Sequence, residues 1–407
     1  MYDLLDRLSI VEASAFVAAP LAAMTLAQLG AEVIRVDMIG GGLDYNRWPL
    51  SKETGRSLYW AGLNKGKKSV AVNLRDPRGR ELVQTLATRP GDDAGILLTN
   101  FAGLPWLSQE VLEEKRADAI SVAVKGSPDG SPAVDYTINC AVGYPHLTGP
   151  DTTPVNNVLP AWDVGCGLHA ALAIVASVDR RKRTGRGGRA EVALSDVAMA
   201  MVGNMGQIGE VQRNGVDRGP IGNDLYGAFG RDFGTSDGRR VMISAITVKQ
   251  WKGLCRVAGI EQTVAGLESA LGADFTDEGQ RFEWRKVLFA LIEKWSGAHT
   301  LDAVGAALTE AGVTWGPYQT VGQMLADDWR ASEKNPLFQT VTHPEVGDVL
   351  TPGSPIDFRS LERLPVAPAP ALGQHTDQVL AEALGLDSGA IGKLHDDGIV
   401  AGPVQGA

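Results

Sequence analysis

The chain has 407 residues, of which 44% are hydrophobic and 21% are charged, and its formal net charge is −10. This length predicts two or three domains, and the composition is that of a globular protein rather than a disordered or fibrous one. A net negative charge repels polyanions, which argues against nucleic acid as a partner. The three cysteines and six histidines are too scattered for a disulfide framework or a helix-borne metal site, so we expect no bound metal.

The sequence also argues against an association with membranes. No segment near the start has the basic, apolar and small-residue order of a signal peptide. No segment reaches the ~18 uninterrupted apolar residues of a membrane span. We therefore expect a cytoplasmic protein with no membrane partner.

The first forty residues predict a βαβ unit. Residues 8–12 and 31–37 are apolar, strand-like runs, and residues 20–29 carry apolar positions at helical spacing before Gly30 ends the helix. Such a unit builds a parallel sheet. The turn at residues 13–19 contains no glycine, so it lacks the loop that brings backbone close to the pyrophosphate of NAD.

Strands and helices continue to alternate along the chain. Strand-like runs lie at 69–74, 95–98, 119–124 and 190–194, and helical patterns lie at 78–88, 163–181 and 376–386. Residues from about 220 to 325 combine a strand with amphipathic helical patterns, as in a small α+β domain. The five prolines of residues 351–373 exclude a continuous helix or a central strand, so this segment should run extended over a surface.

These patterns predict an α/β protein with a large domain, built on a parallel sheet, and a smaller α+β domain. We expect the large domain to begin with residues 1–215 and the small domain to span residues 216–330. Residues 331–407 should then return to the large domain and complete it.

A lysine-rich turn at residues 62–69 resembles a phosphate loop. It has only three residues between its glycines and a second lysine before its serine, so the spacing of that motif is missed. We expect Lys65, Lys67 and Lys68 to form a solvated turn, with contact to a phosphate group as the alternative.

Asp163 stands at the start of the longest helical pattern. An aspartate at this point is typical of an N-cap, whose carboxylate accepts free backbone N–H groups. The same position lies in the positive potential of the helix N-terminus, which keeps a carboxylate ionised and able to act as a nucleophile. The residues alone leave both interpretations open.

No other side chain stands out as a nucleophile. The sequence has no G-x-S-x-G elbow. Cys166 lies between two glycines inside the helical pattern, which is typical of a packed small residue rather than a reactive thiol.

The chain resembles the family III CoA transferases almost from end to end. In that family, the aspartate before the long helix is the catalytic nucleophile, so the resemblance implies that role for Asp163. The resemblance rests on segments that follow one another in family order: 19–20, 26–34, 64–69, 99–101, 183–187 and 372–377.

The resemblance also implies a fold and an assembly. The family has a Rossmann-like large domain built from both ends of the chain, a smaller middle domain, and two subunits threaded through one another as an interlocked homodimer. It uses no tightly bound cofactor, because coenzyme A enters as part of the substrate.

The resemblance implies CoA contacts at three places, although their side chains differ from those of some relatives. Formyl-CoA transferases carry Gln where this chain has Val17, Arg where it has Met38, and a further Arg where it has Ser108. The matching contacts should therefore depend mainly on backbone. The residues concerned are Val17, then Val72, Asn73, Leu74 and Arg75, and then Asn100, Phe101 and Ala102.

Within the family, the chain resembles a branch that moves CoA from the C1 to the C4 carboxyl group of 2-methylfumarate (mesaconate). Segments 14–20, 40–45, 159–163, 226–233 and 352–355 carry this similarity. The free carboxylate of such a substrate needs a cation, for which Arg47 and Arg231 are candidates. Intermolecular transfer to a separate acid is the main alternative. A 2-methylacyl-CoA racemase is disfavoured, because Val134 stands where racemases carry a histidine.

Overall fold

The computed structural model describes residues 1–101 and 103–403, which divide into two compact units. The first unit contains Met1–Val142, Asn157–Asn214 and the described residues from Trp329 onward, and the second contains Gly143–Asn156 and Gly215–Asp328. The short segment 143–156 therefore belongs to the second unit, although the sequence analysis placed it inside the large domain.

The first unit is built on a seven-stranded sheet in the order β12-β3-β2-β1-β4-β5-β6. Its strands pair in parallel except β12, which pairs antiparallel with β3 at one edge. The predicted α/β class with a parallel sheet is confirmed. In sheet order the strands are β12 (Val400–Ala401), β3 (Lys68–Val72), β2 (Glu32–Met38), β1 (Ser9–Ala13), β4 (Ile96–Thr99), β5 (Ile120–Lys125) and β6 (Gly188–Ala193).

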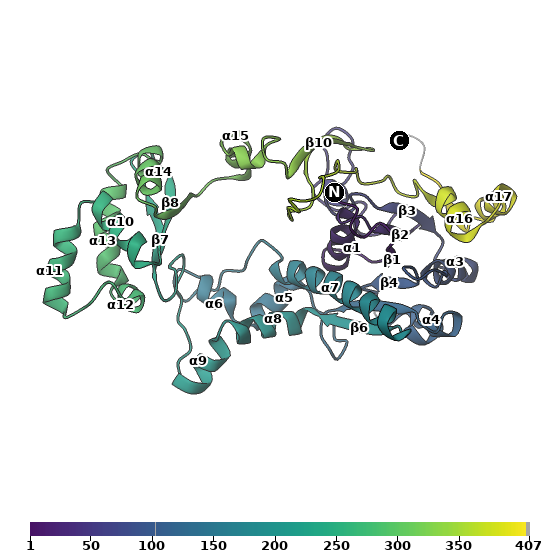
Figure 1. Ribbon diagram of the computed structural model, residues 1–407, viewed down its shortest axis with the longest axis horizontal. Helices are drawn as coiled ribbons and strands as arrows, with labels where there is room; N and C mark the ends of the chain where they lie inside the picture. The colour runs from purple at the N-terminus through teal and green to yellow at the C-terminus, as the bar shows by residue number, and fades with distance from the viewer. Residues whose placement is uncertain (102, 404–407) are drawn as a thin grey trace. The chain divides into compact units, whose positions relative to one another are not determined.

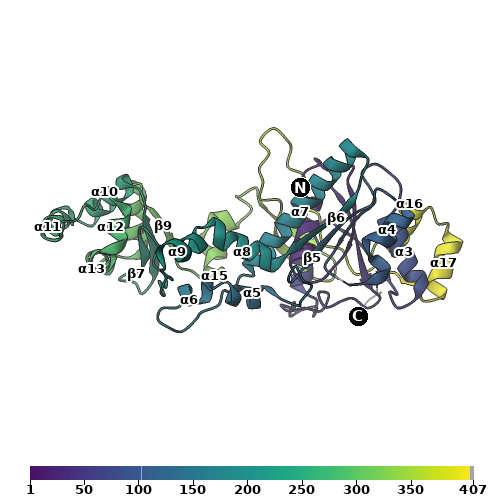
Figure 2. The ribbon, with the colours of Figure 1, turned by 90° about the horizontal axis from the view of Figure 1, so that it is seen from below.

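Helices cover both faces of this sheet, as is typical of parallel sheets, whose central strands are buried on both sides. The four strands in the middle of the sheet, β2, β1, β4 and β5, are almost entirely buried. Figures 1 and 2 show α1 and α7 on one face and α3 and α4 on the other. The first face carries α1 (Ala18–Gln28), α5 (Asp135–Ala141), α7 (Ala161–Thr184) and α8 (Leu194–Asn204), from which α9 (Gln207–Asn214) continues. The second carries α3 (Pro77–Ala87), the turn η1 (Pro105–Leu107), α4 (Gln109–Lys115), α16 (Thr376–Leu384) and α17 (Ser388–Asp396).

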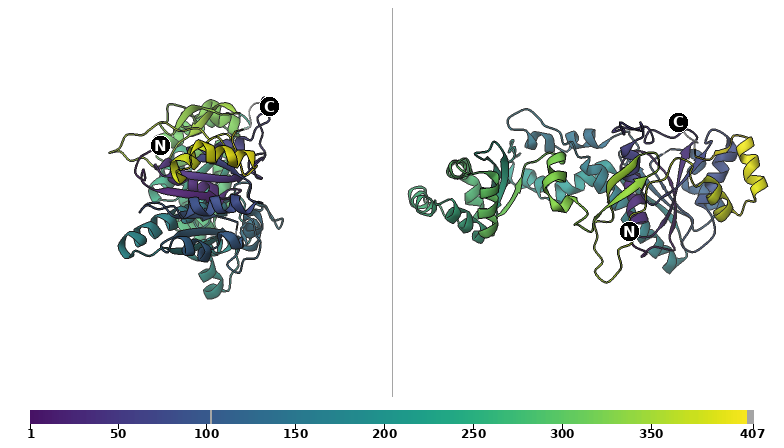
Figure 3. Two further views of the ribbon diagram at one scale, coloured as in Figure 1. Left: turned by 90° about the vertical axis from the view of Figure 1, so that its right-hand side faces the viewer. Right: turned by 90° about the horizontal axis from the view of Figure 1, so that it is seen from above.

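The last part of the chain completes the first unit from its edge. A short turn η2 (Trp329–Ala331) leads to a hairpin of β10 (Phe338–His343) and β11 (Gly347–Pro352). The proline-rich residues that follow contain no helix and no further strand up to α16, as predicted. Figure 3 shows α16 and α17 beside the sheet, where α16 packs against β3 and α3.

The second unit has a core of its own. Its antiparallel sheet consists of β7 (Phe229–Gly234), β8 (Arg240–Ala245) and β9 (Thr314–Pro317). Aromatic side chains lie in its interior among aliphatic ones, and Phe229 packs against Phe233 and Phe289. The helices of this unit are α6 (Tyr144–Thr148), α10 (Val248–Val257), α11 (Glu261–Leu271), α12 (Glu278–Glu283), α13 (Arg285–Ser296), α14 (Leu301–Glu310) and α15 (Val321–Asp327).

Helix α7 is the one described helix that is long and apolar enough to cross a membrane. Core helices of soluble proteins meet the same criteria of length and composition. Cys166, Ala170 and Ile174 of this helix are fully buried in the core of the first unit. Its apolar residues therefore have a role in the packing of the first unit.

Candidate active site

Asp163 lies in the first turn of α7, two residues after the helix begins. The backbone N–H groups of Trp162 and Asp163 both donate to one carboxylate oxygen of Asp135, at 2.6 and 3.0 Å. Asp135 is buried, comes from α5, and satisfies donors that a helix N-terminus leaves free. The interpretation of Asp163 as the N-cap is therefore wrong, because Asp135 performs that function.

The carboxylate of Asp163 is half-buried, and its surroundings disfavour the ionised form. Burial, and then the negative charge of Asp135, raise the pKa of Asp163 to about 6, while Arg47 acts to lower that pKa. The sequence suggested that the helix N-terminus would keep this pKa low, and that suggestion is wrong. A carboxylate with a pKa of about 6 is nevertheless mostly ionised at pH 7. Among the described residues no donor forms a hydrogen bond with its oxygens, which leaves them available for an incoming electrophile.

Close packing of α7 on α1 brings the first turn of α7 next to the loop that precedes α1. A Cβ atom added to Gly167 would lie 2.6 Å from the carbonyl oxygen of Ala18, so this approach requires glycine. Asp163 lies one turn before Gly167. The site therefore forms where the β1–α1 loop, residues 14–17, meets the start of α7.

The same loop lies at the point where the strand order of the sheet reverses, between β1 and β4. Open α/β sheets bind ligands at this point, beyond the carboxyl ends of the strands. Val17 precedes α1, and Asn100 follows β4. The amide of Asn100 accepts from the N–H of Ala15 at 3.0 Å and donates to its carbonyl at 2.6 Å. The structure thus brings two predicted CoA-binding residues, Val17 and Asn100, to one place.

The remaining predicted CoA-binding residues lie elsewhere along the same edge. Phe101 is half-exposed beside Asn100, and Ala102 lies outside the described residues. The run from Val72 to Arg75 consists of the last residue of β3 and the turn after it, and β3 is separated from β1 by β2. The N–H of Asn73 donates to Ile399, and the N–H of Arg75 donates to the Asn73 side chain. These two backbone donors therefore already have partners within the protein.

Arg47 lies near Asp163, as the effect of its charge on that carboxylate shows. Its guanidinium carbon is 5.3 Å from the centre of the Phe16 ring and 5.2 Å from the centre of the Tyr59 ring. The sequence analysis did not single out Phe16 or Tyr59. A tyrosine twelve residues from Arg47 has no motif to mark it, and only the folded loop brings the three side chains together.

Arg231 lies on β7 of the second unit. Its guanidinium carbon is 5.1 Å from the centre of the Phe289 ring, and its Nε is 4.0 Å from Asp224. Asp224 also pairs with Arg285 at 2.9 Å. Arg231 and Arg285 thus share one carboxylate, which leaves this pair of arginines with a net positive charge.

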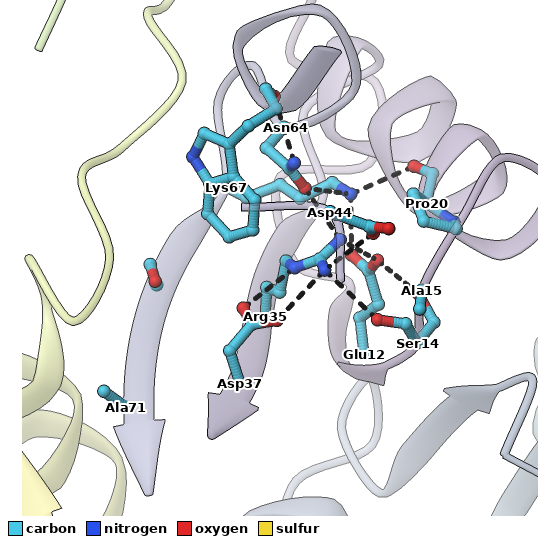
Figure 4. Close-up of polar contacts among 12 residues, drawn as sticks. Glu12, Ser14, Ala15, Pro20, Arg35, Asp37, Asp44, Asn64, Lys67 and Ala71 are labelled. Carbon is cyan, nitrogen blue, oxygen red and sulfur yellow. Dashed lines mark hydrogen bonds and ion pairs between the residues drawn. The ribbon is translucent and has the colours of Figure 1, made fainter. Parts of the chain in front are cut away.

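Beneath the β1–α1 loop lies a buried network of charges (Figure 4). Arg35 pairs with three carboxylates, and Lys67 pairs with one of them at 2.7 Å. Arg35 and Lys67 are at most 3% exposed. The prediction of a solvated lysine turn is therefore wrong for Lys67, whose ammonium group is enclosed by fixed acceptors. It is also wrong for Lys65, which is 3% exposed and donates to the carbonyl of Pro352 at 2.8 Å. The carboxylates belong to Glu12, Asp37 and Asp44.

Cys166 is fully buried, as the sequence analysis predicted. Burial, and then the charge of Asp163, raise the pKa of this thiol to about 12. A thiol with such a pKa carries almost no thiolate at neutral pH and is a poor nucleophile. Asp163 therefore has no competitor in the first turns of α7.

Comparisons with known proteins identify the family of this chain. The chain is 50% identical to the 2-methylfumaryl-CoA isomerase of Chloroflexus aurantiacus over 409 residues, with both chains covered completely. It is 28% identical to the succinyl-CoA–D-citramalate CoA-transferase of the same organism, over 94% of each chain. It is 26% identical to human succinyl-CoA:glutarate CoA-transferase, over 97% of this chain and 90% of that protein.

A solved structure shares the fold. A CaiB/BaiF family protein from Brucella suis aligns with a TM-score of 0.76 and 27% identity, over 94% of this chain and all of that one. The family model for CoA-transferase family III matches residues 5–376. This chain therefore belongs to CoA-transferase family III.

Proposed function

We propose that this protein is a 2-methylfumaryl-CoA isomerase, which moves coenzyme A from the C1 to the C4 carboxyl group of one 2-methylfumarate. The observation that carries the proposal is the 50% identity over the full length of a relative with that activity. Relatives that transfer CoA between two different acids share only 26–28% of their residues with this chain.

The first half of the reaction opens the C1 thioester. The ionised carboxylate of Asp163 attacks the thioester carbonyl, and the CoA thiolate leaves, which gives a mixed anhydride between Asp163 and C1. The thiolate then attacks the aspartyl carbonyl and expels 2-methylfumarate as a dicarboxylate. The enzyme now holds CoA as a thioester of Asp163, and one difficult exchange has become two easier steps.

The second half repeats these steps at the other end of the acid. The C4 carboxylate attacks the aspartyl thioester and displaces CoA thiolate, which gives the anhydride between Asp163 and C4. The thiolate attacks the C4 carbonyl, and Asp163 leaves as a free carboxylate. The sequence consumes no water and no proton overall, so its product is an isomer of its substrate.

The geometry around Asp163 supports this role. The carboxylate has no donor of its own among the described residues, and a cation, Arg47, lies nearby to receive a second carboxylate. We assign CoA contacts to the loop edge formed by Val17, by Asn100 with Phe101, and by the turn from Val72 to Arg75. A long ligand can follow this edge because all three segments lie at the carboxyl ends of parallel strands.

We also propose that the protein is a homodimer, in accord with the resemblance to its family. Apolar side chains remain exposed on α7 at positions 168, 172 and 175, with helical spacing, and the exposed fraction of Leu172 is 65%. Further exposed apolar residues, among them Met205 at 68%, follow on α8 and α9 and in the turn between them. Exposed apolar side chains in such number are typical of an interface. Light scattering should give twice the mass of the chain even on dilution, and a monomer would contradict the proposal.

One experiment separates this function from its alternatives. The purified protein is incubated with the C1 thioester of 2-methylfumarate, first alone and then with other dicarboxylic acids, and the thioesters are resolved by chromatography. An isomerase forms the C4 thioester without any added acid. An intermolecular transferase instead requires the added acid and forms its thioester, and that outcome would overturn the proposal.

A further inference from the structure

The loop before α1 contains a residue in an unusual backbone conformation. Phe16 has a φ of 68°, and Glu345 is the only other non-glycine residue with positive φ among those described. A bulky side chain in this left-handed region is strained, so the surrounding structure must hold it there. The strained residue lies at the site rather than at a distant turn.

A buried carboxylate holds Phe16 in this conformation. Asp44 is 1% exposed, and one of its oxygens accepts the backbone N–H of Phe16 at 2.8 Å. Its other oxygen accepts from Arg35 at 3.1 Å. Arg35 also donates to the carbonyl of Ser14 at 3.1 Å (Figure 4). The charge network is thus hydrogen-bonded to the loop at Ser14 and at Phe16, on both sides of Ala15.

The conformation of Phe16 places its ring against Arg47. The guanidinium carbon of Arg47 lies 5.3 Å from the centre of that ring and 5.2 Å from the centre of the Tyr59 ring, both within the range of cation–π contacts. Among the described residues, no hydrogen bond or ion pair engages its guanidinium. Two rings therefore fix this group while its N–H donors remain available.

Tyr59 supplies a second unused donor. Its hydroxyl oxygen is buried and has no hydrogen-bond partner among the residues described. Burial, and then the charge of Asp44, raise the pKa of Tyr59 to about 12, so the hydroxyl keeps its proton. Buried hydroxyl groups normally have partners, so this one points to an oxygen of a ligand.

We propose that Phe16 and Tyr59 clamp Arg47 so that its guanidinium and the Tyr59 hydroxyl bind the free carboxylate of the acyl group. Asp44 is a positioning residue, which sets the clamp by fixing Phe16. This inference rests on the proposed function and adds a basis for specificity. The clamp selects monothioesters of dicarboxylic acids over acyl-CoA thioesters that lack a second carboxylate.

The test compares two substrates in the full-length protein. One is the C1 thioester of 2-methylfumarate, and the other is crotonyl-CoA, which lacks the second carboxylate. Isomerisation of the first is followed by chromatography. Formation of a covalent adduct at Asp163 from the second is followed by mass spectrometry after hydroxylamine treatment.

Two variants separate the parts of the clamp. Phe16→Leu keeps an apolar side chain but removes the ring, and it should raise KM for the dicarboxylic substrate about 5-fold. Tyr59→Phe keeps the ring but removes the hydroxyl, and it should lower kcat/KM for that substrate about 10-fold or more. Neither variant should slow adduct formation from crotonyl-CoA. Phe16→Tyr keeps the aromatic face, so it should restore most of the preference that Phe16→Leu loses.

Tyr45→Phe is the matched control. It removes a hydroxyl two residues from Arg47, but the partner of that hydroxyl is Glu345 at 2.6 Å. It should leave the preference between the two substrates as it is. Equal losses on both substrates in Phe16→Leu and Tyr59→Phe, or no loss on either, would overturn the clamp. Absence of any adduct at Asp163 when the unmodified protein is treated with the C1 thioester of 2-methylfumarate would instead overturn the proposed function, whatever the variants do.

Discussion

The carboxylate of Asp135 accepts the backbone N–H of Asp163 at 3.0 Å, and this contact assigns the capping of α7 to a residue other than the candidate nucleophile. Asp135 caps α7, so the side chain of Asp163 forms no hydrogen bond with the residues that the structure describes. The charge of Asp135 also helps to raise the pKa of its neighbour. In this position the ionised carboxylate lowers the stability of the folded state, but it is available as a nucleophile.

The first prediction concerns Asp163→Asn. The variant should lose more than about 10³-fold in kcat, because an amide cannot form the anhydride. Chromatography of the two thioesters measures this loss, and Asp163→Ala should be equally inactive. A variant that keeps more than a few per cent of turnover would remove Asp163 from the mechanism.

The same substitution should make the protein more stable. Burial raises the pKa of Asp163 from 3.8 to about 6, so above pH 6 the ionised carboxylate destabilises the folded state. Asp163→Asn removes that cost and should raise the free energy of unfolding by about 1–3 kcal/mol at pH 8. The gain should shrink as the pH falls from about 6 to about 4, where the carboxylate becomes protonated in the folded protein. Urea denaturation of the variant and of the unmodified protein, at pH 8 and at about pH 4, measures this gain.

The second prediction concerns the pH dependence of kcat/KM, which reports on ionisations of the free enzyme. Asp163 must be ionised to attack, so activity should fall as the pH drops below about 6, the pKa of this residue. Asp135→Asn keeps an oxygen that can cap α7 but removes a negative charge. It should therefore move the acidic limb of the profile to lower pH.

Arg47→Met provides the opposite change. Arg47 lowers the pKa of Asp163, so its loss should move the acidic limb to higher pH. Opposite shifts in these two variants would show that both charges act on one carboxylate. Shifts in the same direction would show that the limb belongs to another group.

Much of the first unit is predictable from the sequence because its signals are local. The apolar runs of β1 and β2 and the spacing of α1 are visible within forty residues. The long pattern around α7 similarly marks its helix and places Asp163 at its start. What the sequence conceals is contact between distant segments, such as the bond from Asp163 to a carboxylate 28 residues earlier.

Lys67 shows why a local pattern can mislead. Glycines and lysines in succession are typical of a solvated turn, and nothing nearby indicates burial. Its partner Glu12 lies on another strand, and only the pairing of β1 with β2 and of β2 with β3 brings the two together. The segment 143–156 is similar, because its place in the second unit depends on contacts with residues far along the chain.

The third prediction concerns Arg35, whose guanidinium binds three buried carboxylates. Arg35→Met removes the cation and leaves Glu12, Asp37 and Asp44 with only Lys67 to offset their charge. Breaking a buried ion pair from one side typically costs about 3–5 kcal/mol. The variant should therefore unfold at a clearly lower urea concentration. Arg78→Met is the control, because Arg78 pairs with Asp397 at the surface, and its loss should leave the urea midpoint nearly unchanged.

The last prediction follows from what an isomerase needs and an intermolecular transferase does not. Both ends of one 2-methylfumarate must meet the same aspartyl thioester, so the diacid has to turn within the site before it escapes. Retention raises its effective concentration far above that of any free competitor, and well-oriented intramolecular reactions reach about 10⁵ M or more. Incubation of the C1 thioester with isotopically labelled free 2-methylfumarate should therefore give a C4 thioester that contains little label. Mass spectrometry of the product measures the incorporation. If label equilibrates as fast as the isomer forms, the diacid leaves in every cycle, and the protein is an intermolecular CoA transferase.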